Sequence, residues 1–169
     1  NILHKDISLI SPVFSSNSDS ILFEEKENFA IVCARIQQWK GPDVLCNAIK
    51  VMGNENILIK WYGKDSNHDH HSSKSMQLKT EFPTIWGTKI VPFKPIQHTA
   101  LQVIQKMAKY AIIPSTWDVY NFTGLEYFSG GTILICSEGA GISEIIEDGI
   151  NGFKYPKEDY VALAKCIRK

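Results

Sequence analysis

The stretch FAIVCARIQQWKGPDVLCNAIKVM, residues 29–52, decides the fold class of this chain. Residues 29–36 form a β-branched apolar run, which predicts a buried strand. A turn over residues 37–42 follows, and residues 43–52 have the apolar spacing of a helix, with Pro42 suited to its first turn. A strand that leads through a short loop into a helix is the repeating unit of α/β proteins.

The same alternation continues along the chain. Further strands are predicted at residues 56–62, 89–93, 110–114, 132–136 and around 152–153, and further helices at 99–109, from 122 and at 157–169. Residues 64–75, KDSNHDHHSSKS, are polar and predict a loop. Because the strands are apolar on both faces, the sequence predicts a doubly wound, Rossmann-like α/β fold with a parallel sheet covered on both sides.

Composition narrows the possible functions. The 169 residues suffice for one domain that buries roughly 70% of its unfolded surface. Lys+Arg and Asp+Glu both number 18, so charge gives no argument for nucleic acid or a membrane surface as partner. No apolar stretch approaches the roughly 20 residues of a membrane span, and residues 1–10 do not resemble a signal peptide.

The cysteines indicate a reducing compartment. They lie far apart in apolar segments, at Cys33, Cys46, Cys136 and Cys166. We therefore expect buried, reduced thiols and a cytoplasmic location.

Candidate site residues follow the predicted strands, because parallel sheets of this kind bind ligands outside the carboxyl ends of their strands. Arg35 and Lys40 flank the turn after the first strand. A guanidinium and an ammonium are the usual groups that hold phosphate oxygens, so the two can converge on one anion. The alternative is that they are two solvated loop cations.

The segment WDVYNFTGLE, residues 117–126, places two carboxylates around the start of a predicted helix. Free backbone amides at that start can bind phosphate or sugar oxygens, and they belong to Tyr120, Asn121, Phe122 and Thr123. Glu126, about one turn into the helix, can accept two hydrogen bonds from a vicinal diol such as a ribose. The alternative is that Asp118 caps the helix and Glu126 favours its positive end.

Two further groups of residues are less specific. Gly130 and Gly131 predict a helix C-cap, and residues 139–141 predict a tight strand-to-helix turn near a ligand. The cluster His68, Asp69, His70 and His71 lies in a polar loop without helical i, i+4 spacing, so we expect no metal site there.

Together these residues resemble the C-terminal, nucleotide-sugar-binding domain of the retaining glycosyltransferases of family 4 (glycosyl transferases group 1), which have two Rossmann-like domains in the GT-B architecture. The family pattern runs strand-Gly-Arg-Leu-x-x-x-Lys-Gly, then Pro-Ser-x-x-Glu-x7-Glu-Ala, Gly-x-Pro-Val, Gly-Gly-x-x-Glu and Asp-Gly-x-x-Gly. The matching segments here are residues 34–41, 114–126, 131–134, 140–144 and 148–152. Their order and spacing hold from about residue 29 to residue 169.

The resemblance implies a role for each matching residue. Arg35 and Lys40 would bind the nucleotide diphosphate and neutralise it as it leaves, and Asp118 would contact the transferred sugar. Glu126 would hold the ribose, and the amides after Asp118 would contact sugar and phosphate. The loop with Phe93 and Lys94 looks like the one that touches the base.

The resemblance also implies a substrate and a domain organisation. The donor would be a nucleotide diphosphate sugar, such as a UDP or GDP sugar, whose hexosyl group moves to a glycan, lipid or other acceptor without a metal or other cofactor. An N-terminal domain absent from this segment would bind the acceptor and provide any membrane association. Residues 1–28 would be a linker and irregular lead-in, and residues 29–169 the donor-binding domain, inactive when isolated.

Several positions depart from the family pattern. Asp118 replaces the usual Glu, Val119 and Asn121 replace small residues or glycine, and Ala34 replaces a Gly. Two alternatives therefore stay open. One is a degenerate domain that serves as a binding or scaffold module. The other is a nucleotide-sugar epimerase or hydrolase of the same architecture, which would need an extra acid/base group such as a His near the site.

Overall fold

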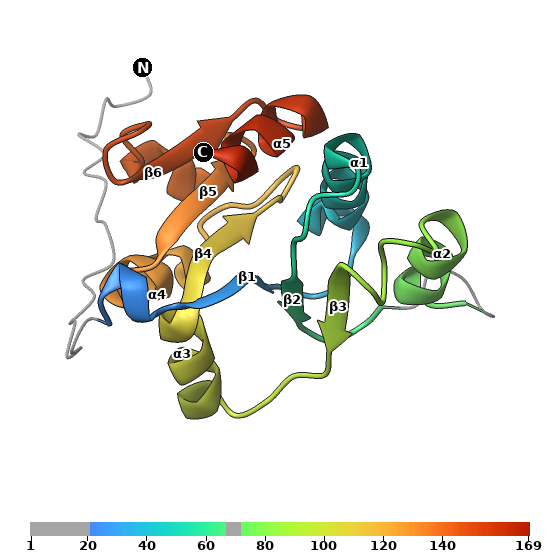
Figure 1. Ribbon diagram of the computed structural model, residues 1–169, viewed down its shortest axis with the longest axis horizontal. Helices are drawn as coiled ribbons and strands as arrows, with labels where there is room; N and C mark the ends of the chain where they lie inside the picture. The colour runs from blue at the N-terminus through green and yellow to red at the C-terminus, as the bar shows by residue number, and fades with distance from the viewer. Residues whose placement is uncertain (1–20, 67–71) are drawn as a thin grey trace, which may run out of the picture.

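The computed structural model describes residues 21–66 and 72–169, and these build one six-stranded sheet between layers of helices (Figure 1). The strands are β1 (Glu27–Cys33), β2 (Ile59–Tyr62), β3 (Ile90–Phe93), β4 (Ala108–Ile113), β5 (Ile133–Ser137) and β6 (Gly152–Tyr155). Their order is β3-β2-β1-β4-β5-β6, and every neighbouring pair is parallel. The predicted doubly wound, Rossmann-like α/β fold is confirmed.

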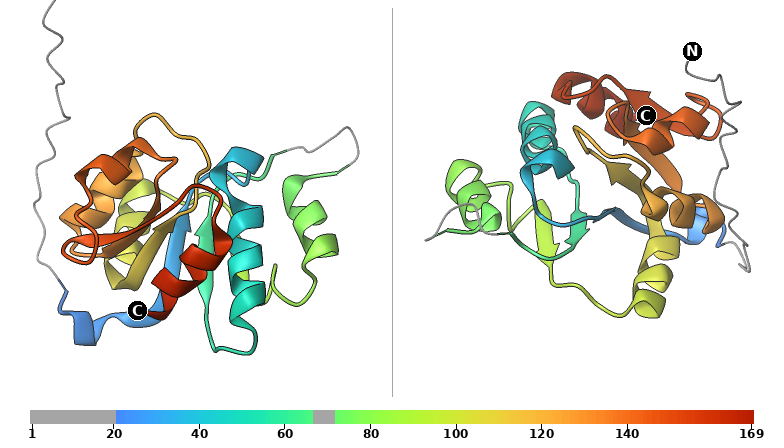
Figure 2. Two further views of the ribbon diagram at one scale, coloured as in Figure 1. Left: turned by 90° about the horizontal axis from the view of Figure 1, so that it is seen from above. Right: turned by 180° about the vertical axis from the view of Figure 1, so that it is seen from behind.

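The helices form two separate cores, one on each face of the sheet. On one face lie α1 (Pro42–Met52), α2 (Lys74–Glu81) and α5 (Tyr160–Arg168), and Figure 2 shows α1 beside α5. Leu45, Leu78 and Leu163 from these helices are fully buried in that core. On the other face lie α3 (His98–Met107) and α4 (Phe122–Ser129), where Tyr127 packs with strand residues such as Ile31.

Short 3-10 helices complete the chain: η1 (Phe23–Glu25), η2 (Gln38–Lys40) and η3 (Gly141–Ile145). Gly130 is the C-cap of α4 and Gly131 follows with a φ of 65°, as predicted for that glycine pair. All four cysteines are free thiols, three buried and Cys33 half-buried. Within the residues that the structure describes, no helix is long and apolar enough to cross a bilayer.

The predicted helix at 99–109 is wrong at both ends. It begins at His98 and ends at Met107, and Ala108 and Lys109 belong to β4 instead. Ala108 is extended, fully buried and paired with Glu27 of β1. The apolar spacing of the helix runs without a break into the apolar residues of the strand, so periodicity alone could not find this boundary.

The predicted loop at 64–75 extends too far, because α2 begins at Lys74. Ser73 is its N-cap, and the Ser73 hydroxyl accepts a hydrogen bond of 3.2 Å from the amide of Met76. The helix buries only Lys74 and Leu78, so its sequence has little of the apolar spacing that would have revealed it.

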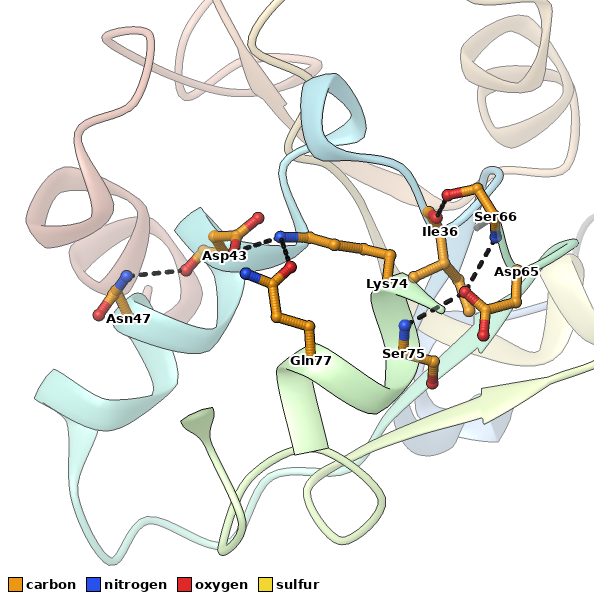
Figure 3. Close-up of polar contacts among 8 residues, drawn as sticks. All are labelled: Ile36, Asp43, Asn47, Asp65, Ser66, Lys74, Ser75 and Gln77. Atoms are coloured by element: carbon orange, nitrogen blue, oxygen red, sulfur yellow. Dashed lines mark hydrogen bonds and ion pairs between the residues drawn. The ribbon is translucent and has the colours of Figure 1, made fainter. Parts of the chain in front are cut away.

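Lys74 joins α2 to α1 through an ion pair in which the ammonium is buried (Figure 3). Its Nζ lies 2.7 Å from Oδ1 of Asp43 and 3.0 Å from Oε1 of Gln77. The Lys74 side chain is 3% exposed, so the ammonium depends on these partners for the hydrogen bonds that water would otherwise provide. The pair therefore fixes α2 against the helix that follows β1.

The end of β2 is fixed to the loop after β1 by a second group of polar contacts (Figure 3). The Ser66 hydroxyl donates to the carbonyl of Ile36 over 2.6 Å. Oδ1 of Asp65 accepts from the backbone amides of Ser66 and Ser75, at 2.9 and 3.2 Å. These bonds hold the loops after β1 and β2 together at the carboxyl edge of the sheet.

Candidate functional site

A cleft of about 450 Å³ opens where the strand order reverses, between the loops that follow β1 and β4. This switch point is where open α/β sheets bind ligands. The cleft is lined by Cys33, Ala34, Arg35, Gln37, Trp39, Lys40, Asp118, Tyr120, Asn121, Phe122 and Thr123. The structure thus brings seven of the predicted site residues together: Arg35, Lys40, Asp118, Tyr120, Asn121, Phe122 and Thr123.

The loop after β1 packs tightly on the end of β4. Gly41 has a φ of 72°, and a Cβ at this position would lie 1.8 Å from the carbonyl oxygen of Pro114. The amide of Thr116 donates to the carbonyl of Trp39 over 2.9 Å. Only glycine fits at residue 41, and its absence of a side chain lets Lys40 approach the segment that follows β4.

The loop after β5 supports the same segment from the other side. The amide of Asp118 donates to the carbonyl of Gly139, and the amide of Gly141 donates to the carbonyl of Asp118, both over 3.1 Å. A Cβ at Gly141 would lie 1.9 Å from the carbonyl oxygen of Val119. The tight turn predicted at residues 139–141 is confirmed, and it fixes the backbone that carries Asp118.

Lys40 and Asp118 form an ion pair within the cleft. Nζ of Lys40 lies 2.6 Å from Oδ2 of Asp118, and the two side chains are 19% and 17% exposed. The side-chain amide of Asn121 donates to the same oxygen over 3.1 Å. Arg35 is exposed on the rim. The site therefore holds one cation that is already paired and a second that solvent can reach.

The first residues of α4 lie at the cleft. Its N-cap is Asn121, and no side chain of the described residues caps it, so the alternative in which Asp118 is the cap is wrong. Phe122 and Thr123, the first helical residues, line the cleft. The first amides of a helix have no partner within the helix, so they can bind an anion.

Glu126 lies beside the cleft rather than in its lining, and both its oxygens are occupied. Nε2 of His98 lies 2.8 Å from Oε1, and Nε2 of Gln105 donates to Oε2 over 3.0 Å. Gln105 also lies 3.8 Å from Sγ of Cys33, which does line the cleft. Sequence reasoning missed His98 and Gln105, although a helix places residues seven apart on one face.

Phe93 and Lys94 line a different cleft, of about 700 Å³, together with Ile36 and Lys64. The rings of Tyr62 and Phe93 stack there, with centroids 4.9 Å apart. A third cleft, of about 430 Å³, shares Arg35 with the cleft of Lys40 and Lys64 with the cleft of Phe93. The structure therefore does not bring the predicted base loop into the cleft of Lys40.

Cys33, at the edge of the cleft, is a neutral thiol. Burial raises its pKa to about 11, the contact with the Gln105 amide opposes the shift, and the negative charge of Glu126 acts in the same direction as burial. A thiol with this pKa has almost no thiolate at neutral pH, so Cys33 is not a nucleophile.

The predicted histidine loop lies outside the described residues, since residues 67–71 are not among them. Within 21–66 and 72–169, no three His, Cys, Asp or Glu side chains gather in a way that could hold a metal ion.

The family model for glycosyl transferases group 1 matches residues 13–169. The chain belongs to this family. This glycosyltransferase domain is 26% identical over 140 residues to an uncharacterized glycosyltransferase of Methanocaldococcus jannaschii, covering 82% of the chain and 34% of the relative. It is 23% identical to a glycogen synthase of Thermodesulfovibrio yellowstonii, covering 98% of the chain and 30% of the synthase.

Solved structures share its fold. Anabaena HepE, crystallised in complex with UDP-glucose, superposes with a TM-score of 0.67 at 18% identity, covering 83% of this chain and 38% of HepE. The glycosyltransferase domain spans about a third of the length of the curated relatives that it matches. It therefore corresponds to one part of those longer enzymes.

Proposed function

We propose that this domain holds the nucleotide diphosphate sugar donor of a retaining, family 4 hexosyltransferase. The observation that carries the proposal is the cleft at the switch point, where Lys40, Arg35 and the open amino end of α4 surround one space. Two cations and a helix start are the groups that proteins use to bind phosphate. The solved HepE complex, with UDP-glucose in a protein of this fold, supports the same ligand class.

In this proposal the positive groups act on the leaving group. When the bond between sugar and phosphate breaks, negative charge builds up on the departing nucleotide diphosphate. Lys40, Arg35 and the amides of Phe122 and Thr123 stabilise that charge from the places that the fold gives them around one cleft. Preorganised donors of this kind are usually the largest single contribution to catalysis, and each contributes roughly 3–4 kcal/mol. The chemistry then uses the positive charge of the protein itself and needs no metal.

The two acidic residues, Asp118 and Glu126, bind the two sugars of the donor. Asp118 contacts hydroxyls of the transferred hexosyl group, and Glu126 accepts hydrogen bonds from the ribose. Asp118 is already held by Lys40 and Asn121, so it meets the donor as an oriented carboxylate. A bound phosphate then competes with Asp118 for Lys40, which couples the sugar contact to the diphosphate contact.

The base contact comes from the loop that begins at Phe93 and Lys94. This loop ends where α3 begins, at His98, and His98 contacts Glu126. One end of the loop is therefore next to the proposed ribose acid, where its backbone can reach the base. Phe93 and Lys94 themselves lie at the far end of the loop, in the neighbouring cleft.

Transfer to an acceptor requires more than this domain. Because the domain spans about a third of its curated relatives, we propose that the rest of the enzyme binds the acceptor, whether a glycan, a lipid or another molecule. The isolated domain would bind a nucleotide diphosphate and transfer nothing. We propose a cytoplasmic enzyme, with any membrane association through that other part.

A second candidate is a nucleotide-sugar epimerase or hydrolase of the same architecture. The contact between His98 and Glu126, at 2.8 Å, favours it because it places a titratable imidazole next to a carboxylate near the site. The full-length enzyme distinguishes the two functions. A transferase consumes the donor only when an acceptor is present, whereas the epimerase or hydrolase consumes it without one.

Calorimetric titration of this chain with UDP, GDP and ADP tests the proposal. We expect one of the three to bind in preference to the others, and its nucleoside without phosphates to bind at least about tenfold more weakly, since the charged hydrogen bonds to phosphate are lost. Absence of binding by all three would contradict the proposal and favour the scaffold module.

A further inference from the structure

The carboxylate of Glu126 is held by two residues of one helix. His98 and Gln105 lie seven positions apart on α3, which places them on the same face, two turns from each other. His98 contacts Oε1 and Gln105 donates to Oε2, so the two oxygens of Glu126 have different partners. This arrangement fixes the direction of the carboxylate.

The two partners differ in their exposure to solvent. The side chain of His98 is 62% exposed, and that of Glu126 is 16% exposed. Gln105 is only 3% exposed, and its amide also contacts the Cys33 sulfur at the edge of the cleft. The Oε1 partner of Glu126 is therefore open to solvent, whereas the Oε2 side is fixed from within the protein.

Gln105 is an unusual choice for a position in the core. A buried amide costs free energy unless it is hydrogen-bonded, and an apolar side chain of the same size would pack without that cost. The backbone of Gln105 is held separately, because the Thr132 hydroxyl donates to its carbonyl over 2.9 Å. The side-chain amide of Gln105 therefore holds the Glu126 carboxylate, and it is not needed to attach α3 to the rest of the protein.

We infer that Gln105 is a positioning residue whose buried amide aims Glu126 at the two hydroxyls of the donor's ribose. The inference rests on the proposed function. An ionised carboxylate that accepts one fixed hydrogen bond keeps its remaining lone pairs directed at the ligand. Gln105 thereby sets the preference of the site for a ribose over a sugar that lacks these hydroxyls.

The test measures sugar preference in the nucleotide. The chain is titrated with UDP and with 2′,3′-dideoxy-UDP, or with the corresponding pair for GDP or ADP if that base binds more tightly. We expect the intact chain to bind the ribose form about tenfold or more tightly than the dideoxy form. The ribose hydroxyls donate hydrogen bonds to a charged carboxylate, and such bonds contribute at least this much. Gln105→Met should reduce this preference to about threefold or less and leave the affinity for the dideoxy form unchanged.

Two further variants keep the test decisive. Thr132→Val removes the hydroxyl that holds the Gln105 carbonyl, so it should lower stability but keep the ribose preference. If Gln105→Met does not fold, Gln105→Asn retracts the amide by one methylene and should lower the preference in the same way.

Each outcome has a separate meaning. A Gln105 variant that keeps the full ribose preference, or that weakens both nucleotides equally, would overturn the positioning role while leaving the proposed function intact. An intact chain without any ribose preference would overturn the role as well. Failure of all three nucleotides to bind would overturn the proposed function, and this inference with it.

Discussion

The side chains of Lys40 and Asp118 form the central ion pair of the cleft. The pair is less than one-fifth exposed, and Asn121 adds a second donor to the same oxygen of Asp118. A partly buried pair of this kind is screened less by solvent than a surface pair. In the proposed function, a phosphate that enters the cleft would compete with Asp118 for Lys40, and Asp118 would then be available to the sugar.

Loss of either cation should lower turnover. In the complete enzyme, Lys40→Ala or Arg35→Ala should reduce kcat at least about a hundredfold, because each removes a preorganised positive group that faces the leaving diphosphate. Steady-state kinetics with the natural donor measure the effect. Lys50→Ala, on the exposed end of α1, is the control and should keep the wild-type rate. Near wild-type turnover in both site variants would contradict the roles of Arg35 and Lys40.

Loss of the acid should separate binding from transfer. Asp118→Asn removes the negative charge that competes for Lys40, so the nucleoside diphosphate should bind about fivefold more tightly, within the range expected for one partly exposed ion pair. Transfer by the complete enzyme should fall, because the sugar contact is weakened. Glu158→Gln, an exposed charge change on the segment before α5, serves as the control for calorimetry. Unchanged or weaker diphosphate binding would show that the ion pair does not compete with phosphate.

At this scale the sequence predicted seven of the residues that line the cleft, but it did not separate Phe93, Lys94 and Glu126 from them, and it did not predict how the charged side chains pair. Arg35, Lys40 and Asp118 could be selected because strand ends and charge types follow from local pattern. The departure at Asn121 raised doubt in the sequence, and in the structure its side chain is the second donor to Asp118. His98 and Gln105 were not predicted as site residues. Their contacts with Glu126 depend on how α3 packs against α4, and a local sequence pattern does not predict that packing.

The elements around the site are held together by close backbone contacts at glycines. Gly41 places the start of α1 against the end of β4, and Gly141 places η3 against the backbone of residue 119. Each loop therefore supports its neighbour, and the cleft depends on three strand ends at once.

Substitution at Gly41 should show this dependence. Gly41→Ala combines the strain of a positive φ with a Cβ that would overlap the Pro114 carbonyl, so it should destabilise the chain by about 3 kcal/mol or more. Gly149 has a φ of 77° and open space around it, so Gly149→Ala should cost only about 1 kcal/mol. Urea unfolding measures both values. Equal losses in the two variants would mean that the close contact at Gly41 is unimportant.

Element boundaries were the weakest part of the sequence prediction. The strands came out at nearly the right places because apolar runs bounded by turns are distinctive. The sequence places Ala108 in a helix, whereas in the structure it pairs with Glu27 of β1. This pairing depends on the tertiary fold, so the local sequence pattern does not reveal it. The helix α2 was missed altogether, because it buries only Lys74 and Leu78, and the charged Lys74 occupies its buried position through pairing with Asp43.

At the scale of the whole molecule, the fold follows from alternation of strands and helices, and two cores cover the two faces of the sheet. These cores also contain titratable side chains. Burial raises the pKa of Cys33 to about 11 and that of Cys136 and of Tyr110 to about 12. Burial raises the pKa of Tyr127 and Tyr155 well above the usual value.

These shifts predict that the chain loses stability in alkali. A group whose pKa is raised on folding keeps its stabilising contribution below its unfolded pKa, about 8.5 for a thiol and about 10 for a tyrosine. That contribution is lost as pH rises toward the folded pKa, because the unfolded chain then releases protons that the folded chain retains. Burial lowers the pKa of Lys26, so this residue favours the folded chain in alkali. It is a single group, and the buried thiols and phenols that act in the opposite direction are several.

The midpoint of urea unfolding under reducing conditions measures this effect. It should be constant from pH 7 to about pH 8 and fall clearly by about pH 10.5. A midpoint that is unchanged or higher at the alkaline end would contradict the assigned burial of the thiols and phenols.

The central claim is that Arg35, Lys40 and the amino end of α4 surround one diphosphate. A crystal structure of this chain with its tightest-binding nucleoside diphosphate is the most direct test. We expect phosphate oxygens within hydrogen-bonding distance of both side chains and of the amides at residues 122 and 123, with the ribose at Glu126. A diphosphate bound instead in the cleft of Phe93 and Lys94, away from Lys40, would contradict it.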